Sequence, residues 1–255
     1  MIQERKFDNL IIRIHEERPA MGADAATAVA ERINILLSKQ DFVNVIFAAA
    51  PSQNEFLFFL SKRQDVCWNQ VNAFQMDEYV GLNKNARQLF GNFLKEHLFD
   101  KLPFNSVYYI DGNASDVELE CQRYANLLRQ YPPDLSCMGI GVNTHIAFND
   151  PHTANFKDPL QVKIIDLDFV SRRQQVDDGC FENLGEVPSL AITLTIPVLL
   201  QANYIYCIVP GINKAEAIYH TLNDEINEKH PSTILRMHPN AVLYLDANSS
   251  SKIEE

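Results

Sequence analysis

A histidine suited to proton transfer follows an apolar run in the middle of the chain, with two polar residues beside it in the sequence. The run 135–140 is typical of a short buried strand, and the glycines that end it, Gly141 among them, permit a sharp turn in which backbone N–H groups approach a ligand. His145 follows, with Asn143 two residues before it and Asp150 five residues after it. Imidazole titrates near neutral pH, and an open α/β sheet usually places its chemistry at strand ends. We therefore expect a site of acid–base chemistry here.

A pair of carboxylates follows a second buried run. The run 71–76 predicts a strand that delivers Asp77 and Glu78 at its carboxyl end. A carboxylate in a partly dry pocket can take a proton from a C–H bond, whereas a solvated strand end is the ordinary explanation for such residues. We favour the catalytic interpretation for Asp77 and a supporting role, positioning the loop, for Glu78.

The elements that must position these side chains alternate along the chain. Strands are predicted at 9–15, 43–50, 71–76, 106–110, 135–140, 162–167, 190–195, 204–209 and 241–245. Helices are predicted at 20–39, 87–98, 116–130 and 213–222, and one begins at Pro51, where Ser52 can cap it. This alternation predicts an α/β, Rossmann-like fold: a mostly parallel sheet with helices on both faces, in a single domain over 1–255 with a polar tail at about 248–255.

Composition excludes several classes of function. A net charge of −11 argues against a nucleic-acid partner or an anionic membrane surface. We find no signal peptide and no apolar run long enough to span a membrane. The five cysteines form no C-x-x-C pair and no zinc-ligand spacing is visible, so we expect reduced thiols, a cytoplasmic protein and no metal.

Two stretches carry a resemblance to a known family. The first is Met138-Gly-Ile-Gly-Val-Asn-Thr-His-Ile-Ala-Phe-Asn-Asp-Pro151, and the second is Phe74-Gln-Met-Asp-Glu-Tyr-Val-Gly-Leu82. Together, in this order and at this separation, they resemble the glucosamine-6-phosphate deaminase (isomerase) family, over about residues 20–245. The 6-phosphogluconolactonases share that family's fold. The resemblance implies a sugar-phosphate substrate and no organic cofactor or metal. Relatives form oligomers, so a homo-oligomer is one expectation, and the number of subunits stays open.

The resemblance also implies roles for single residues. Asp77 matches the base that moves a proton between sugar carbons one and two. His145 matches the histidine that helps to open the sugar ring, supported by Asp150 and by Asn143. Imidazole suits that step because it exchanges protons near neutral pH.

The phosphate-binding residues are implied by position. Ser52 and Gln53 fall on the turn that holds the phosphate at a helix N-terminus, although a simple helix cap explains Ser52 equally well. Lys214 matches the phosphate lysine, and the N–H groups around Gly141 approach the substrate. Arg172 lies in a loop and could replace the family's phosphate arginine, whose place falls on Asp178. The alternative, which we rate equally, is that Arg172 and Arg173 form a solvated basic pair.

Three departures from the family's pattern concern activity. Asn143 stands where the family usually has aspartate, Asp150 replaces glutamate, and Thr144 replaces glycine. An asparagine oxygen accepts a hydrogen bond but does not stabilise an imidazolium by charge. A comparable change in a serine-protease triad lowers turnover about 10⁴-fold.

These observations leave three functions open. The first is deamination and isomerisation of glucosamine-6-phosphate or galactosamine-6-phosphate. The second is hydrolysis of 6-phosphogluconolactone, which needs an activated water and no C–H base. The third is a non-catalytic sugar-phosphate sensor, which the changes at Asn143 and Asp178 would motivate.

Overall fold

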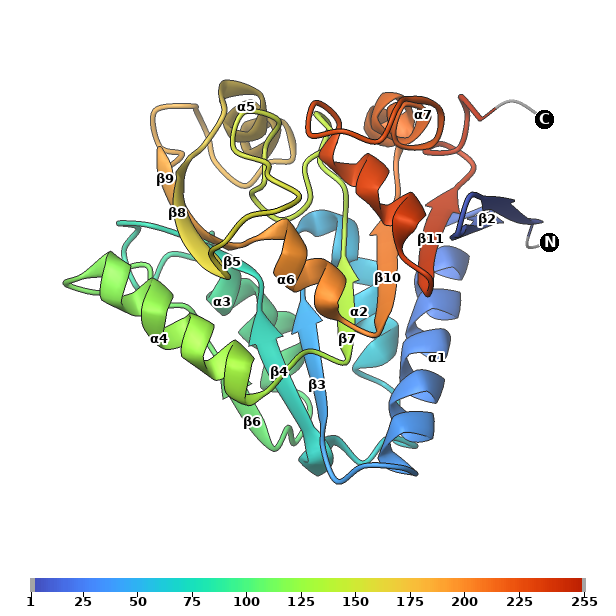
Figure 1. Cartoon of the computed structure of the whole chain (residues 1–255), viewed down its shortest axis with the longest axis horizontal. Helices are drawn as coiled ribbons and strands as arrows, with labels where there is room; N and C mark the ends of the chain where they lie inside the picture. The colour runs from blue at the N-terminus through green and yellow to red at the C-terminus, as the bar shows by residue number, and fades with distance from the viewer. Residues whose placement is uncertain (1–2, 254–255) are drawn as a thin grey trace.

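The structure, a computed structural model, describes residues 3–253, and its centre is a large sheet. The strands of this sheet are β1 (Gln3–Phe7), β2 (Leu10–His15), β3 (Val43–Phe47), β4 (Val71–Gln75), β6 (Ser106–Tyr108), β7 (Leu135–Met138), β10 (Tyr204–Val209) and β11 (Ala241–Asp246). Eight strands lie in the order β1-β2-β11-β10-β7-β3-β4-β6 (Figure 1). Every pair is parallel except β1 with β2. The predicted mostly parallel sheet is confirmed.

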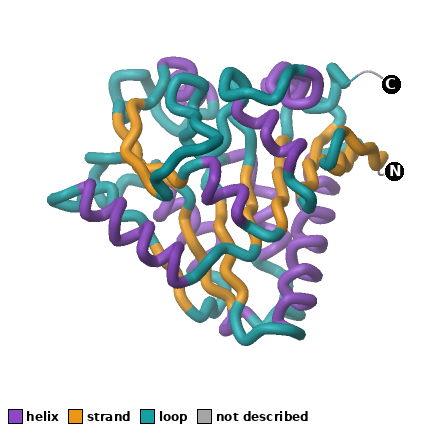
Figure 2. Tube along the Cα trace, in the orientation of Figure 1, coloured by secondary structure: helices purple, strands orange, loops and turns teal. Residues whose placement is uncertain are grey.

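Helices cover both faces of this sheet, as predicted. They are α1 (Arg18–Leu37), α2 (Asn54–Leu60), α3 (Phe90–Leu94), α4 (Val117–Gln130), α5 (Phe169–Asp177), α6 (Ile196–Gln201) and α7 (Ala215–Asn223). One hydrophobic core joins α1, α2 and α3 to one face, and a second joins α4, α6 and α7 to the other. Figure 2 shows strands enclosed by helices, with many of the loops gathered at one edge. The chain therefore has the three-layer architecture of open α/β folds.

A small antiparallel sheet lies beside the main one. Its strands are β5 (Asp77–Tyr79), β8 (Val162–Asp166) and β9 (Leu190–Leu194), in the order β5-β9-β8. β5 follows β4 after a single residue and therefore carries the chain from one sheet to the other. This step fixes the position of the carboxylates at residues 77 and 78.

Several elements were not predicted. The strand β1 has a mostly charged and exposed sequence, without the alternation that marks a strand. α6 and the 3₁₀ segment η5 (Pro231–Met237) were missed as short elements. The predicted helix 87–98 is in fact α3 followed by a π-helical turn (Lys95–Phe99). Ser52 lies within a 3₁₀ turn, η1 (Pro51–Gln53), whose N-cap is Ala50, so the predicted Ser52 cap is wrong.

The helix α5 corrects the expected loop around Arg172. Its buried face carries Ser171, Gln174 and Gln175, while Phe169 is 63% exposed. The usual apolar stripe is absent, because the buried face of this helix is polar. A sequence pattern that relies on buried apolar residues therefore overlooks it.

The order of the strands places the functional end of the sheet. The chain runs outward through β3, β4 and β6 and then returns to β7 on the other side of β3. At such a switch point the loops leaving the carboxyl ends of neighbouring strands diverge and leave a crevice. Three of the loops with predicted functional residues leave β7, β4 and β3.

The remaining sequence predictions concern membranes, thiols and the C-terminal tail. No helix among residues 3–253 is long and apolar enough to cross a membrane. All five cysteines are free thiols. The polar tail is packed at its start, because the backbone N–H of Ser249 donates to Asp246 Oδ1 at 2.8 Å and Ser249 is fully buried. Residues 254–255 of the tail lie outside the described residues.

Candidate active site

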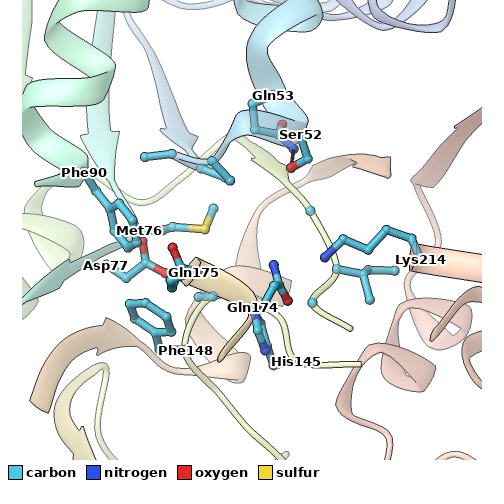
Figure 3. Close-up of a pocket in the computed structure, with 17 residues that line it drawn as sticks. Ser52, Gln53, Met76, Asp77, Phe90, His145, Phe148, Gln174, Gln175 and Lys214 are labelled. Atoms are coloured by element: carbon cyan, nitrogen blue, oxygen red, sulfur yellow. Dashed lines mark hydrogen bonds between the residues drawn. The ribbon is translucent and has the colours of Figure 1, made fainter. Parts of the chain in front are cut away.

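A cavity at the carboxyl edge of the sheet brings most of the predicted residues together. Its walls include Asp77 after β4, Gly141 and His145 after β7, Ser52 in η1, and Lys214 at the start of α7 (Figure 3). Gln53 also lines it. Asn143 and Asp150 do not line the cavity and instead support the ring of His145 from behind. Four loops that are far apart in the sequence therefore meet at one place.

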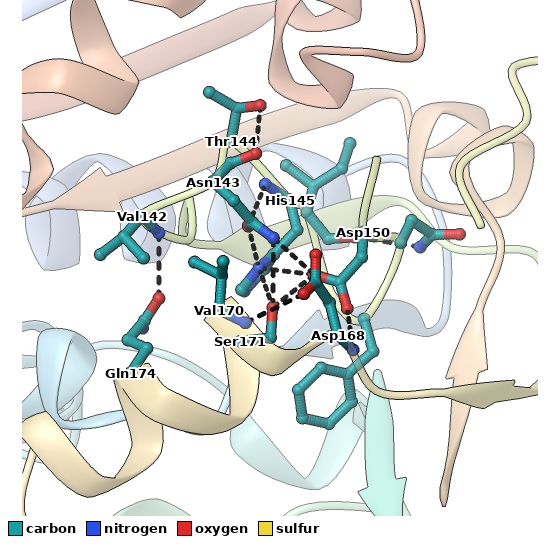
Figure 4. Close-up of polar contacts among 12 residues, drawn as sticks. Val142, Asn143, Thr144, His145, Asp150, Asp168, Val170, Ser171 and Gln174 are labelled. Carbon is teal, nitrogen blue, oxygen red and sulfur yellow. Dashed lines mark hydrogen bonds and ion pairs between the residues drawn. The ribbon is translucent and has the colours of Figure 1, made fainter. Parts of the chain in front are cut away.

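The imidazole of His145 is held through Nδ1. This atom lies 2.6 Å from Asn143 Oδ1, 2.9 Å from Ser171 Oγ and 3.1 Å from Asp150 Oδ1 (Figure 4). The carboxylate and the amide oxygen can only accept, and the hydroxyl of Ser171 donates to Asp150 Oδ1. Nδ1 must therefore carry the proton. A neutral His145 consequently keeps an unprotonated Nε2 for chemistry.

The amide of Asn143 has one favourable orientation. Its Nδ2 donates to Asp150 Oδ1 at 3.0 Å, and this leaves Oδ1 to accept from His145. The reverse orientation would place two acceptors against each other at Asp150 and two donors against each other at His145. Asn143 thus orients the ring, while the negative charge beside the ring comes from Asp150.

Asp150 is fully buried and remains ionised. Burial by itself raises the pKa of its carboxyl. The hydrogen bond and charge of His145, with hydrogen bonds from Ser171 and Asn143, outweigh burial and hold this pKa well below its usual range. Asp150 is one methylene shorter than the glutamate of the family's pattern, and its carboxylate still contacts the imidazole of His145.

Gly141 is required by the position of the imidazole. A Cβ built on Gly141 would lie 2.1 Å from Cε1, 2.2 Å from Nε2 and 2.3 Å from Nδ1 of His145. No real side chain tolerates such distances, so the ring lies directly against the glycine backbone. Gly141 therefore makes room for the ring of His145, and its approach to a substrate stays a prediction.

Thr144 adopts a backbone conformation that favours glycine. Its φ is +68°, which is costly for a β-branched residue. Its N–H donates to Gly141 O at 3.0 Å, and its carbonyl accepts from Ser232 N at 2.9 Å. The neighbouring segment η5 therefore helps to hold the loop that carries His145.

Asp77 forms the opposite side of the site and is only 6% exposed. Burial raises the pKa of its carboxyl well above the usual range, and the charge of Glu78 adds to the rise. Phe90 and Phe148 line the same cavity. A carboxylate in such surroundings is a stronger base than one in water.

Glu78 supports the site from outside the cavity, as predicted. Its carboxylate accepts from the backbone N–H groups of Tyr79 at 2.8 Å, Phe90 at 3.1 Å and Gly91 at 2.9 Å. It also accepts from the side chain of Gln75 at 2.8 Å. By holding the first turn of α3, Glu78 fixes the helix that carries Phe90 into the cavity.

Another part of the cavity is suited to an anion. Lys214 is 4% exposed, and burial lowers the pKa of its ammonium to about 8, although the charge of Asp178 acts in the opposite direction. Gln53 donates to Ile208 O and to Ser52 Oγ, both at 3.1 Å, and its own Oε1 is buried without a partner among the described residues. These groups present one cation and a hydroxyl to the same space.

The structure corrects the expectation for Arg172. This residue does not line the cavity, because its Nη2 donates to the carbonyl oxygens of Leu184 and Val187 at 2.8 Å each. Arg173 pairs with Asp177 on the surface at 2.9 Å. Neither arginine lines the cavity, and Arg172 instead braces the loop after α5.

Three residues of α5 were missed by the sequence analysis. Ser171 bridges Asp150 and His145, and Gln174 Oε1 accepts from the N–H of Val142 at 2.9 Å. Gln174 and Gln175 also line the cavity. The spacing of three and four residues along one helix face is the signal that could have found them.

Comparisons with known proteins point to one family. A model of the family described as glucosamine-6-phosphate isomerases/6-phosphogluconolactonase matches residues 16–244. A glucosamine-6-phosphate deaminase of Exiguobacterium sp. is 32% identical over 231 residues, which are 91% of this chain and 87% of the relative. Another, of Bacillus cereus strain B4264, is 36% identical over 187 residues, 73% of this chain and 70% of the relative.

Solved structures share the fold at lower identity. A monomeric glucosamine-6-phosphate deaminase superposes with a TM-score of 0.85 and 23% identity, covering 94% of this chain and 98% of the other. A 6-phosphogluconolactonase of Thermotoga maritima gives a TM-score of 0.77 and 19% identity, covering 93% and 99%.

Proposed function

This chain belongs to the family of glucosamine-6-phosphate isomerases and 6-phosphogluconolactonases, and from this premise we propose that it is an amino-sugar-phosphate isomerase and deaminase. The reaction converts glucosamine-6-phosphate or galactosamine-6-phosphate and water into a ketose 6-phosphate and ammonia. One observation carries the proposal: buried Asp77 and the imidazole of His145 line the same cavity, together with Lys214. A C–H base, a ring-opening group and an anion site are the three parts that this reaction requires.

His145 opens the sugar ring. Its unprotonated Nε2 takes the proton of the anomeric hydroxyl and returns a proton to the ring oxygen, which gives the open-chain aldehyde. During this step the imidazole carries a positive charge. Asp150, 3.1 Å from Nδ1, stabilises that charge, and Asn143 keeps the ring in position.

Asp77 then moves a proton between two carbons. Its carboxylate removes the proton from C2, while the carbonyl oxygen of C1 gains the proton that the substrate's ammonium group loses. The carboxylate then delivers the C2 proton to C1, so that C1 carries a hydroxyl group and the C2–N bond becomes an imine. Water adds to this imine, and ammonia leaves as the ketose forms. The substrate's own carbonyl and amine accept the electrons, so these steps need no cofactor.

The phosphate binds at the other end of the substrate. Lys214 supplies a positive charge, and Ser52 and Gln53 supply polar groups in the first turn after β3. Buried charges of opposite sign attract strongly in a partly dry cavity. Phosphate therefore fixes the distance between the anchored end and the carbons that react at Asp77.

The test measures three activities with one protein. Release of ammonia and ketose phosphate is followed with glucosamine-6-phosphate and with galactosamine-6-phosphate, and hydrolysis is followed with 6-phosphogluconolactone. We expect ammonia release from an amino-sugar phosphate, lost in His145→Ala and retained in His152→Ala, a matched change at an exposed histidine.

Two results would replace the proposal. Lactone hydrolysis alone would assign the protein to the hydrolase branch that shares this fold. No turnover of any of the three substrates, with a sugar phosphate still raising the melting temperature, would favour a sugar-phosphate sensor.

A cytoplasmic site of action accords with the free thiols at all five cysteines.

A further inference from the structure

A second cluster of ionisable side chains lies outside the catalytic cavity. Asp224 ends α7, His220 lies one turn before it, and His230 precedes η5. Asp224 Oδ2 lies 2.7 Å from His220 Nδ1 and 3.1 Å from His230 Nε2. Among residues 3–253, this is the one group of three or more such side chains whose ligand atoms all lie within 4.8 Å of one another. None of the three has a role in the proposed reaction.

The two ring nitrogens of His230 face different oxygens. Nδ1 of His230 lies 3.4 Å from Thr144 Oγ1, and the single proton of that hydroxyl is donated to the carbonyl of Asn143. The other ring nitrogen, Nε2, lies 3.1 Å from Asp224 Oδ2, and because a carboxylate can only accept, the hydrogen bond here needs a proton on Nε2. A metal ion bound at Nε2 would displace that proton.

His220 is held in the same way. Its Nε2 lies 3.5 Å from Glu216 Oε1, a carboxylate that favours a proton on this nitrogen. Nδ1 lies 2.7 Å from Asp224 Oδ2 and donates to it, since the carboxylate can only accept. A metal ion would take the place of the two protons that His220 and His230 direct at Asp224.

We propose that His220, Asp224 and His230 bind a divalent transition-metal ion, with Zn²⁺ as the representative ion. Two imidazoles and a carboxylate form a common zinc ligand set, and water completes a tetrahedron. With bonds of about 2.0 Å, neighbouring ligand atoms lie roughly 3.3 Å apart, close to the spacings seen here. The two imidazoles are stacked with ring centroids 4.4 Å apart, so both rings must turn for their lone pairs to meet at one ion.

The surroundings have the features of a metal site. Metal-bound histidines usually donate their second N–H to a carboxylate or another oxygen, and Glu216 Oε1 and Thr144 Oγ1 are the oxygens nearest the second ring nitrogens of His220 and His230. The side chains of His220, Asp224 and His230 are 31%, 31% and 29% exposed. An ion can therefore enter from solvent, and a water ligand has space.

The ion would act on the catalytic loop without entering the reaction. His230 contacts Thr144 Oγ1, and Ser232 N–H donates to Thr144 O at 2.9 Å. Thr144 holds a strained φ of +68° directly before His145. Fixing His230 to the end of α7 restrains this loop, so the site has a structural role that goes beyond the proposed activity.

The experiment titrates metal-free full-length protein with Co²⁺, followed by visible absorption, and with Zn²⁺, followed by calorimetry. We expect one ion per chain and the intense absorption bands of a tetrahedral Co²⁺ site. His230→Gln and Asp224→Asn should each weaken Zn²⁺ binding about 10-fold to 100-fold or more. The matched control, His152→Gln, should bind as the parent does.

Two further measurements separate this site from the alternatives. His145→Ala should keep the bound ion, because the catalytic imidazole is not a ligand. Zn²⁺ should raise the melting temperature of the parent and not of His220→Gln, whose metal-free melting temperature reports whether it folds. Equal binding by parent and His220→Gln, loss of binding in His145→Ala, or no binding at millimolar Zn²⁺ would overturn the proposal and leave Asp224 bound to the two imidazoles by hydrogen bonds alone.

Discussion

Oδ1 of Asp150 lies 3.1 Å from Nδ1 of His145 and also accepts hydrogen bonds from Ser171 and Asn143. The carboxylate beside the catalytic ring is therefore fully buried and bound by three groups. Asn143 stands where the family usually has aspartate, and here its amide donates to that carboxylate at 3.0 Å. One charge and one oriented amide take the place of two neighbouring charges.

Exchanges at these two positions should have unequal effects. Asp150→Asn removes the charge that stabilises the imidazolium, so we expect kcat for ammonia release to fall about 10²-fold to 10⁴-fold. Asn143→Asp adds a charge where Asp150 already provides one, so kcat should change by less than about tenfold. Steady-state kinetics of both variants checks this, and the reverse order of effects would show that Asn143 limits the reaction.

Asp77→Asn should distinguish the two enzyme functions. The amide cannot remove a C–H proton, so ammonia release and exchange of the C2 proton with solvent should fall about 10²-fold to 10⁴-fold. Hydrolysis of a lactone needs no such base and would continue. Retained ammonia release in this variant would exclude Asp77 as the base.

The stability advantage of the same variant over the parent should grow as pH rises. Burial holds the pKa of Asp77 in the folded protein well above its value in the unfolded chain. The protonated carboxyl therefore contributes its full share to the parent's free energy of unfolding below the unfolded-state pKa. This contribution is lost as pH rises through the folded-state pKa. Asp77→Asn should therefore melt at a higher temperature than the parent at about pH 8, with little advantage at about pH 4. A melting temperature below the parent's at both pH values would contradict an electrostatic cost at this site.

Gly141→Ala should impair catalysis more than folding. The new Cβ would lie 2.1–2.3 Å from three atoms of the His145 ring, so the ring must move from its place beside Asp150. A displacement of about 1 Å costs roughly 10²-fold in rate, and we expect kcat to fall by at least that amount. Gly185→Ala, at an exposed glycine whose Cβ would lie 3.2 Å from its nearest neighbour, is the matched control. Equal activity of the two variants would show that the His145 ring can take another position without loss of catalysis.

Lys214 should give substrate binding a pH limit. Burial lowers the pKa of the ammonium to about 8, so the charge that attracts phosphate is present below that pH and lost above it. KM for a 6-phosphorylated substrate should rise above pH 8 in the parent. Lys214→Arg, which stays charged, should remove this rise, and Lys214→Met should raise KM about tenfold or more at neutral pH. A KM that changes neither with pH nor in Lys214→Met would show that the phosphate binds elsewhere.

The sequence by itself determined the mostly parallel sheet, the positions of its main strands along the chain and the residues at their carboxyl ends. Local patterns were sufficient here, because a buried strand is a short apolar run and Asp77 and His145 directly follow such runs. Neighbouring parallel strands end at the same edge, so side chains that follow them meet without further information.

The tertiary structure alone decided which more distant residues join the site. The helix α5 buries Ser171 and Gln174 against the His145 loop, and a helix with a polar buried face has no apolar period to reveal it. Arg172 was lost from the site because loop carbonyls, which no pattern identifies, take its hydrogen bonds. His230 approaches His220 and Thr144 only through the turn before η5. Contacts of this kind depend on how elements pack, and packing is set by the whole chain.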